Sequence, residues 1–171
     1  RAIHKYGKVI INDISAGELD PLIVDVAAEH DVPYVAMHMK GDPRTMQSMT
    51  DYRDIVAEVV DYFRERTAQL RERGVRRIVV DPGFGFAKTL EQNYELLRGL
   101  HRLAELGYPV LAGVSRKSMI YKLLGTTPAE ALNGTTALHW ECLRQGAAIL
   151  RVHDTREAVE VVRMFDQFMQ A

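Results

Sequence analysis

The sequence predicts an α/β fold with parallel strands, and two observations carry this prediction. Five short apolar or β-branched segments alternate with longer helical segments, and no hairpin turn joins one strand to the next. Strands without hairpins are connected by crossovers, which are right-handed and leave neighbouring strands parallel. The pattern fits either an open doubly wound sheet or part of a (β/α)8 barrel. The expected strands are residues 8–12, 34–38, 77–81, 110–114 and 148–152.

The helical segments carry start and stop signals of their own. Residues 52–73 place their apolar side chains on one stripe and end before Gly74, which is typical of a helix that covers a sheet. A short helix is expected to open at residues 115–118 and to run to Leu124. Capping pairs open the other helices: Thr89 with Gln92 for a helix to about residue 106, Thr127 with Glu130 around Pro128, and Asp154 with Glu157.

Composition indicates one globular domain, expected to span residues 1–171. Of the 171 residues, 47% are hydrophobic and 26% are charged, as in ordinary folded domains. The formal net charge of -1 argues against nucleic acid or an anionic membrane as a partner. No apolar run approaches the roughly 20 residues that cross a bilayer. The single cysteine, Cys142, is expected to be a packed thiol, and its lack of a disulfide partner suits a cytoplasmic protein.

Polar side chains stand at the end of every expected strand. They are Asn12 and Asp13, then His38, Asp81, Ser115 with Arg116 and Lys117, and finally Arg151 with His153. Parallel α/β folds bind ligands at the carboxyl ends of their strands, so these endings predict a site. A barrel would gather all five endings on one rim, whereas an open sheet would spread them along an edge.

Asp81 opens the motif Asp-Pro-Gly-Phe-Gly-Phe, residues 81–86. The glycines and the proline are explained by a tight turn after the strand, but the carboxylate is not. A buried carboxylate needs donors, and a planar amidine-like edge would supply two parallel hydrogen bonds. A dinucleotide-binding loop is disfavoured, because the third glycine is lacking and the next strand ends in Ser115 rather than in an acidic residue.

Two later strand ends favour anion binding. Arg116 and Lys117 stand at a helix N-terminus, where a solvated basic turn is the ordinary interpretation and recognition of an anion or carboxylate is the preferred one. Arg151 and His153 lie on one face of a strand end, which suggests a phosphate or pyrophosphate clamp. A catalytic triad at His153 is disfavoured, because no G-x-S-x-G elbow is present. Met37 is interpreted as an apolar wall against a flat ring rather than as part of a metal site.

Taken together, five motifs resemble the dihydropteroate synthase family, and the resemblance extends over the whole chain. The motifs are Ile11-Asn12-Asp13, Met37-His38-Met39-x-Gly41-x-Pro43-x-Thr45-Met46-Gln47, residues 81–86, Ser115-Arg116-Lys117 and Arg151-Val152-His153-Asp154. The resemblance implies a (β/α)8 TIM barrel that joins 6-hydroxymethyl-7,8-dihydropterin pyrophosphate to p-aminobenzoate in folate biosynthesis. It also implies inhibition by sulfonamides, a possible homodimer, and magnesium bound through the pyrophosphate and an N-terminal segment, with no metal ligand in this chain.

Residue roles follow from the same resemblance. It implies that Asp81 and Asn12 hold the pterin edge while Met37 packs on the pterin face. Lys117 would bind the pterin oxygen and ring nitrogen, and Gly113 is placed with the substrate-binding residues. Phe86 would contact the p-aminobenzoate ring and Ser118 its carboxylate. Arg151 and His153 would bind the departing pyrophosphate, and with Lys117 they form the expected catalytic set.

The chain departs from the family pattern in extent. A (β/α)8 barrel needs eight strands and about 250 residues, whereas five strands are predicted here, so the chain resembles the last five βα units of the enzyme. The family's Asn-Val-Thr-Pro-Asp-Ser-Phe segment and its strand ending in Val-Asp-Thr have no counterpart. Two alternatives stay open: a methyltetrahydrofolate-dependent methyltransferase, which would have no pyrophosphate to hold, and a non-catalytic pterin-binding fragment.

Overall fold

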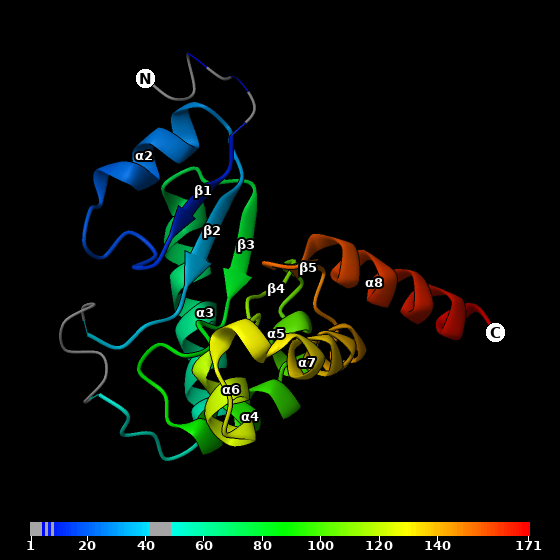
Figure 1. Cartoon of the computed structure of the whole chain (residues 1–171). Coiled ribbons are helices and arrows are strands. Elements are labelled where there is room, and N and C mark those ends of the chain that lie inside the picture. Colours follow the sequence, from blue (N-terminus) through cyan, green and yellow to red (C-terminus); the bar gives the residue numbers. More distant parts are fainter. Residues whose placement is uncertain (1–4, 6, 8, 42–48) are drawn as a thin grey trace.

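The computed structural model describes residues 5, 7, 9–41 and 49–171. Its strands are parallel and follow one another in chain order (Figure 1). Strands β1 (Ile11–Asp13), β2 (Tyr34–Met37) and β3 (Ile78–Asp81) form one sheet, and β4 (Leu111–Ala112) and β5 (Ile149–Leu150) form another. A parallel bridge between Val80 and Val110 connects the two. The predicted parallel α/β arrangement is therefore confirmed. Residue 8 of the first expected strand and residues 43–47 of the second motif lie outside the described residues.

Strands β4 and β5 are shorter than predicted, because the pairing between them is irregular. The carbonyl oxygen of Val110 accepts from the amides of both Ala148, at 2.9 Å, and Ile149, at 3.1 Å, so two residues of one segment face one residue of the other. Pairing then continues to Arg151, whose amide donates to Ala112 O at 3.0 Å. The strand ends that carry the polar residues thus remain side by side.

The helices between the strands pack along the sheets and connect them (Figure 1). The described helices are α2 (Leu22–Glu29), α3 (Ile55–Glu72), α4 (Leu90–Arg98), α5 (His101–Ala104), α6 (Ser118–Leu124), the 3-10 turn η2 (Pro128–Glu130), α7 (Leu132–Arg144) and α8 (Thr155–Gln170). Helix α8 follows the last strand, packs against α7 and projects away from the sheets. No helix in the described part of the chain is long and apolar enough to cross a bilayer.

Two predicted helices are divided differently in the structure, and one predicted capping bond is absent. The helix expected from Thr89 to about residue 106 is broken into α4 and α5 at Gly99, where a Cβ would come within 2.7 Å of the Val56 methyl groups. The capping pair Thr127–Glu130 caps only η2, and the long helix α7 begins after it. Asp154 precedes α8 without a side-chain capping bond, because its carboxylate is taken by Arg116.

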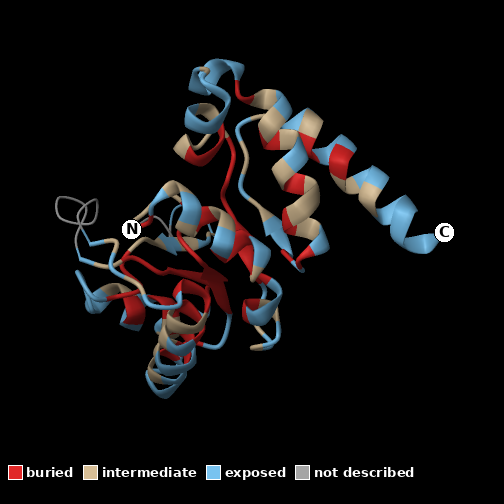
Figure 2. Ribbon diagram, turned by 90° about the horizontal axis from the view of Figure 1, so that it is seen from below, coloured by how far each residue is buried: buried red, intermediate tan, exposed pale blue. Residues whose placement is uncertain are grey.

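The main core lies between the strands and the helices that cover them. Phe63 of α3 and Phe84 of the loop after β3 are both 0% exposed there, and alternate strand residues such as Tyr34 and Ala36 point into the same layer. On the opposite face of the sheet a smaller cluster is formed by Val35, Val79 and Leu111. Figure 2 shows buried residues concentrated on the strands and on the helix sides that face them.

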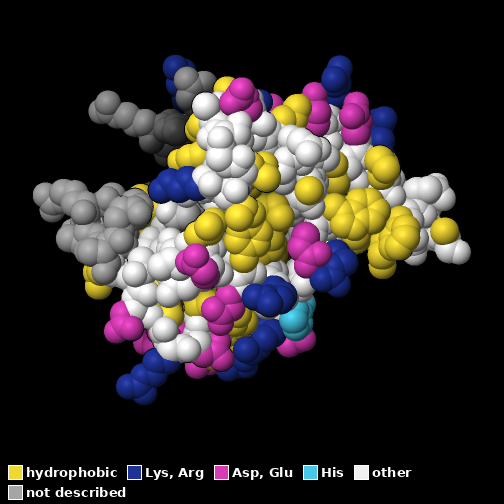
Figure 3. Space-filling model, turned by 60° about the horizontal axis from the view of Figure 1, so that its bottom comes forward, with side chains coloured by type: hydrophobic (Ala, Val, Ile, Leu, Met, Phe, Trp, Pro, Cys, Tyr) yellow, Lys and Arg dark blue, Asp and Glu magenta, His cyan; other side chains and the backbone are white. Residues whose placement is uncertain are grey.

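Charges on the surface are mixed in sign. The face in Figure 3 carries basic and acidic side chains interspersed with apolar ones, in keeping with a net charge of -1. Cys142 is 0% exposed, so the expectation of a packed thiol is confirmed, and burial raises the pKa of the thiol to about 12.

Candidate functional site

Asp81 is the most deeply buried acidic group at the strand ends. It is the last residue of β3, lies opposite Met37 of β2 in the parallel register, and is 2% exposed. Among the described residues its carboxylate accepts one hydrogen bond, from Gly83 N to Oδ1 at 2.8 Å. Burial raises the pKa of the Asp81 carboxyl, and the charges of Lys117, Arg151 and Lys88 oppose that rise. The carboxylate therefore has acceptor capacity left for a ligand.

Glycine at position 83 brings the loop after β3 against the end of β2. The residue has φ +69°, and a Cβ there would lie 2.1 Å from His38 O and 3.3 Å from Met37 Cγ. Any other residue would therefore push the loop away from β2. The register of β2 and β3 places Met37 beside Asp81, and Gly83 lets the loop approach them closely.

Lys88 is a residue at this site that the sequence analysis missed. Its side chain is buried, and Nζ lies 3.1 Å from Gly83 O, 2.9 Å from Phe86 O and 3.2 Å from His38 Nδ1. Burial lowers the pKa of Lys88 to about 7, against the opposing charge of Asp81. The available signal was a lysine two residues after the glycine-rich motif, a position that usually indicates a solvated helix start.

Lys117 reaches back to the same loop from the segment that follows β4. Its ammonium donates to Phe84 O and lies 4.9 Å from the centre of the Phe86 ring. The pKa of Lys117 is lowered to about 8, mainly by burial; the charge of Asp81 opposes this shift and the charge of Arg151 adds to it. Lys117, Phe86 and Asp81 thus form one cluster in which a cation lies beside a half-buried aromatic ring and a buried carboxylate.

Next to this cluster lies a pocket of about 230 Å³ lined by the ends of β4 and β5. Its lining residues are Gly113, Ser115, Lys117, Arg151, Val152 and His153. The Arg151 guanidinium lies over Gly113, where a Cβ would come within 3.2 Å of Nε. Three nitrogen-bearing side chains around a small opening match the oxygens of a phosphate-like anion.

A hydrogen bond holds the ring of His153. Ser115, which is 3% exposed, has its Oγ 2.9 Å from His153 Nδ1, and the same Oγ accepts from His153 N at 3.2 Å. The backbone amide can only donate to Oγ, and in the tautomer in which Nδ1 carries no proton the Ser115 hydroxyl donates to Nδ1. The neutral ring then carries its own proton on Nε2, which is free to donate to an anion in the pocket.

Arg116 does not point into the pocket, contrary to the expectation from sequence. Its guanidinium makes a two-pronged pair with Asp154 at 2.9 Å and 2.6 Å and also donates to Pro128 O and Ala129 O. Its backbone has φ +54°, so the residue is held in a strained conformation by these bonds. Arg116 therefore connects the segments that follow β4 and β5, while Lys117 and Ser115 line the pocket of about 230 Å³.

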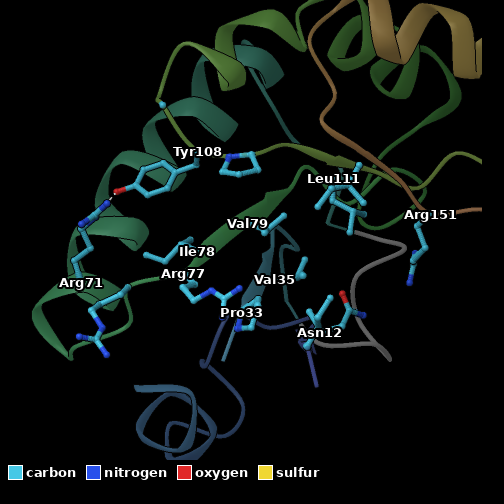
Figure 4. Close-up of a pocket in the computed structure, with 15 residues that line it drawn as sticks. Asn12, Pro33, Val35, Arg71, Arg77, Ile78, Val79, Tyr108, Leu111 and Arg151 are labelled. Atoms are coloured by element: carbon cyan, nitrogen blue, oxygen red, sulfur yellow. Dashed lines mark hydrogen bonds between the residues drawn. The ribbon is translucent and has the colours of Figure 1, made fainter. Parts of the chain in front are cut away.

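The remaining predicted residues are spread more widely. Asn12 and Arg151 are exposed and line a larger pocket of about 670 Å³. This pocket lies on the face of the sheet opposite the main core, where Val35, Val79 and Leu111 also line it. Figure 4 shows Asn12 and Arg151 at one side of it and Arg71 with Tyr108 at the other. Ser118 begins α6 and is half-buried, outside both pockets.

The Asp13 side chain forms hydrogen bonds with its own loop and with Tyr34. Its carboxylate accepts from Ser15 N, Ser15 Oγ, Gly17 N and Tyr34 OH, at 2.6–2.9 Å. Hydrogen bonds from these groups lower the pKa of the carboxyl despite its partial burial, which raises it. This side chain therefore shapes the turn after β1 and has no acceptor positions directed at the pockets.

Comparison with known proteins places this geometry in a family. The model of the family described as "Pterin binding enzyme" matches residues 1–153. The chain belongs to the pterin-binding enzyme family. Within the family it is 43% identical over 163 residues to the dihydropteroate synthase of Synechocystis sp. and 43% identical over 169 residues to that of Escherichia coli K12. These alignments cover 94% and 98% of the chain but only 56% and 60% of those two proteins.

Solved structures of pterin-binding enzymes share the fold. Dihydropteroate synthase from Thermus thermophilus superposes with a TM-score of 0.91 at 41% identity, covering 95% of this chain and 66% of that one. The Xanthomonas albilineans enzyme in complex with 7,8-dihydropteroate gives a TM-score of 0.89 at 40% identity, covering 100% and 63%. The chain thus spans about three fifths of the length of the relatives that it matches.

Proposed function

We propose that this chain carries the pterin and pyrophosphate sites of a dihydropteroate synthase, and that residues 1–171 are one pterin-binding domain with five strands of a (β/α)8 barrel. The reaction joins 6-hydroxymethyl-7,8-dihydropterin pyrophosphate to p-aminobenzoate, with release of pyrophosphate. The observation that carries the proposal is the adjacency of a buried carboxylate, Asp81, to a small pocket lined by Lys117, Arg151 and His153. Each half of the substrate has a chemical counterpart there.

The carboxylate side suits the pterin. Ionised Asp81 accepts two hydrogen bonds from the amino group and ring N–H of the pterin, which form a planar donor pair. Met37, buried beside it, provides an apolar surface for the ring. Asn12 of β1, which lines the larger pocket, is proposed to add a polar contact to the pterin from that side.

The basic side suits the pyrophosphate. The Arg151 guanidinium and the Nε2–H of His153 donate to its oxygens, and the Lys117 ammonium lies between them and the pterin. When the carbon–oxygen bond at the methylene group breaks, its electron pair leaves with the pyrophosphate, and these donors stabilise that charge. The arylamine nitrogen then forms the new bond to the methylene carbon and loses a proton to solvent.

The p-aminobenzoate position follows from the same cluster. Phe86 offers a half-buried ring face beside Lys117, and Ser118 at the start of α6 offers a hydroxyl for the carboxylate. Sulfonamides, which are arylamines of similar shape, are proposed to compete there. This is supported by a Yersinia pestis dihydropteroate synthase structure described as a sulfonamide drug complex, 35% identical to this chain.

A magnesium site does not fit the described residues. No group of three His, Cys, Asp or Glu side chains is placed to hold a metal in the part of the chain that the structure describes. The anion pocket presents an ammonium, a guanidinium and an imidazole, whereas Mg²⁺ prefers oxygen ligands. We therefore assign no step to a metal held by these residues.

Calorimetric titration of the 171-residue protein tests the proposal. We expect pterin pyrophosphate to bind, inorganic pyrophosphate to compete with it, and p-aminobenzoate to bind at a separate position. Product formation is measured in parallel, and binding without turnover would support the non-catalytic alternative. A folded protein that binds methyltetrahydrofolate but neither pterin pyrophosphate nor pyrophosphate would overturn the proposal in favour of the methyltransferase.

A further inference from the structure

Lys88 is a buried cation whose contacts come from two different elements. It follows Ala87, which has φ +51°, at the end of the loop between β3 and α4 (residues 82–89). Its Nζ contacts Gly83 O and Phe86 O within that loop, and His38 Nδ1 at the end of β2. The ammonium therefore joins this loop to the neighbouring strand end.

The contacts match the donors of a charged amine. An ammonium group has three N–H donors, and three acceptors lie 2.9–3.2 Å from Nζ. Burial lowers the pKa of His38 well below its usual value, with the charge of Lys88 acting in the same direction, so the ring is neutral and its Nδ1 accepts. Every donor of the charged side chain is thus used.

Fold stability alone is a weak explanation for such a group. Desolvating a charge opposes folding, and buried charges are often replaceable by apolar side chains without loss of stability. Lys88 also lies in the field of Lys117 and Lys40, two further cations, which adds repulsion that the charge of Asp81 offsets. The contacts of Lys88 are instead concentrated on the segment that carries Asp81 and Phe86.

We propose that Lys88 is a positioning residue that holds the loop after β3 against β2, and so sets where Phe86 lies relative to Met37. The two side chains belong to different elements, and the Lys88 ammonium connects those elements through Phe86 O and His38. This proposal rests on the proposed function, in which Phe86 faces p-aminobenzoate and Met37 faces the pterin. Lys88 itself touches neither substrate.

The test compares Lys88→Met with wild type and with Lys122→Met, a control that removes an exposed lysine from α6. Methionine keeps the length of the side chain and removes its donors. Hydrogen exchange is measured at Gly83, Gly85 and Phe86, whose amides donate to Asp81 Oδ1, Asn93 Oδ1 and Gly83 O. We expect exchange there to accelerate at least tenfold in Lys88→Met, with the α3 amides unchanged.

Ligand titrations separate positioning from a general loss of structure. We expect Lys88→Met to weaken p-aminobenzoate binding about tenfold, the worth of one well-placed aromatic contact with Phe86. Sulfate binding at the Arg151 and His153 pocket should change less than twofold. In Lys88→Ala, which leaves space for an added amine, ethylammonium should restore p-aminobenzoate binding, whereas it should not do so in Lys88→Met.

The outcomes distinguish this inference from the function on which it rests. If wild type binds no p-aminobenzoate while loop exchange still accelerates in Lys88→Met, the proposed function fails and the loop-holding role stands. A folded Lys88→Met protein with wild-type exchange at residues 83–86 overturns the role of Lys88. So does equal weakening of p-aminobenzoate and sulfate binding.

Discussion

Replacing Asp81 with Asn isolates the proposed pterin contact from the fold. The amide has the size of the carboxylate and keeps Oδ1 as an acceptor for Gly83 N, now 2.8 Å away. What it removes is the negative charge and the second acceptor oxygen. One donor of the pterin's donor pair then faces an NH₂ group in a pocket where Asp81 is 2% exposed.

The size of the effect follows from burial. Leaving a buried donor unpaired costs about 1–3 kcal/mol, and hydrogen bonds to a charged acceptor are roughly twice as strong as neutral ones, which favours the upper end. About 3 kcal/mol corresponds to a loss of roughly a hundredfold in affinity, since each 1.4 kcal/mol is about tenfold. Asp81→Asn is therefore expected to weaken pterin pyrophosphate binding roughly a hundredfold.

The stability of Asp81→Asn should not fall with its pterin affinity. Burial raises the pKa of Asp81 above its value of 3.8 in the unfolded chain, so the folded protein disfavours the ionised carboxyl. The protonated form contributes stability below pH 3.8, and this contribution is lost as the pH rises through the folded-state pKa. At pH 7 Asn removes the cost of the buried charge, so the melting temperature of Asp81→Asn should equal or exceed that of wild type.

Titration calorimetry and thermal unfolding at pH 7 measure both effects. Asp61→Asn is the matched control, because Asp61 is exposed on α3 and pairs only with Arg64 among the described residues. Wild-type affinity for pterin pyrophosphate in a folded Asp81→Asn protein would refute the assigned contact. A lower melting temperature would refute the account of Asp81 as a group whose charge is costly to the fold.

Three further outcomes are expected. Ser115→Ala should weaken sulfate binding roughly three- to tenfold, the worth of one hydrogen bond. In this variant ¹⁵N NMR should show a mixture of the two neutral tautomers of His153. A tautomer unchanged from wild type would contradict the role given to the Ser115 hydroxyl. Sulfate affinity should fall as the pH rises through about 8, because burial lowers the pKa of Lys117 to about 8 and only the ammonium form is charged. The same decline in Lys117→Arg would show that deprotonation of Lys117 does not cause it. Phe63→Ala, at a 0% exposed position, should lower the free energy of unfolding in urea by about 3–5 kcal/mol, and a loss below 1 kcal/mol would contradict the core packing.

Several features of the protein were predictable from the sequence because they depend on near neighbours along the chain. The strand order follows from the alternation of apolar segments and helices, and the Thr89–Gln92 capping box forms as predicted, with Gln92 N donating to Thr89 Oγ1 at 3.2 Å. The position of Asp81 at a strand end follows from the run of apolar residues before it. Each of these is decided within a few residues by backbone geometry and local hydrogen bonding.

Tertiary structure alone decided which polar groups at the strand ends are available to a ligand. Arg116 and Asp154 are 38 residues apart and neutralise each other, whereas the neighbouring Lys117 points to the loop after β3. Lys88 contacts His38, which is 50 residues away in the sequence, and its side chain is buried. Three basic side chains thus end in different surroundings: Arg116 pairs with Asp154, Lys117 donates to Phe84 O, and Lys88 is buried beside His38. The physical reason is that a buried charge needs hydrogen-bonding partners, and the fold decides which groups come within reach. Because these partners are distant in the sequence, no local sequence pattern predicts them.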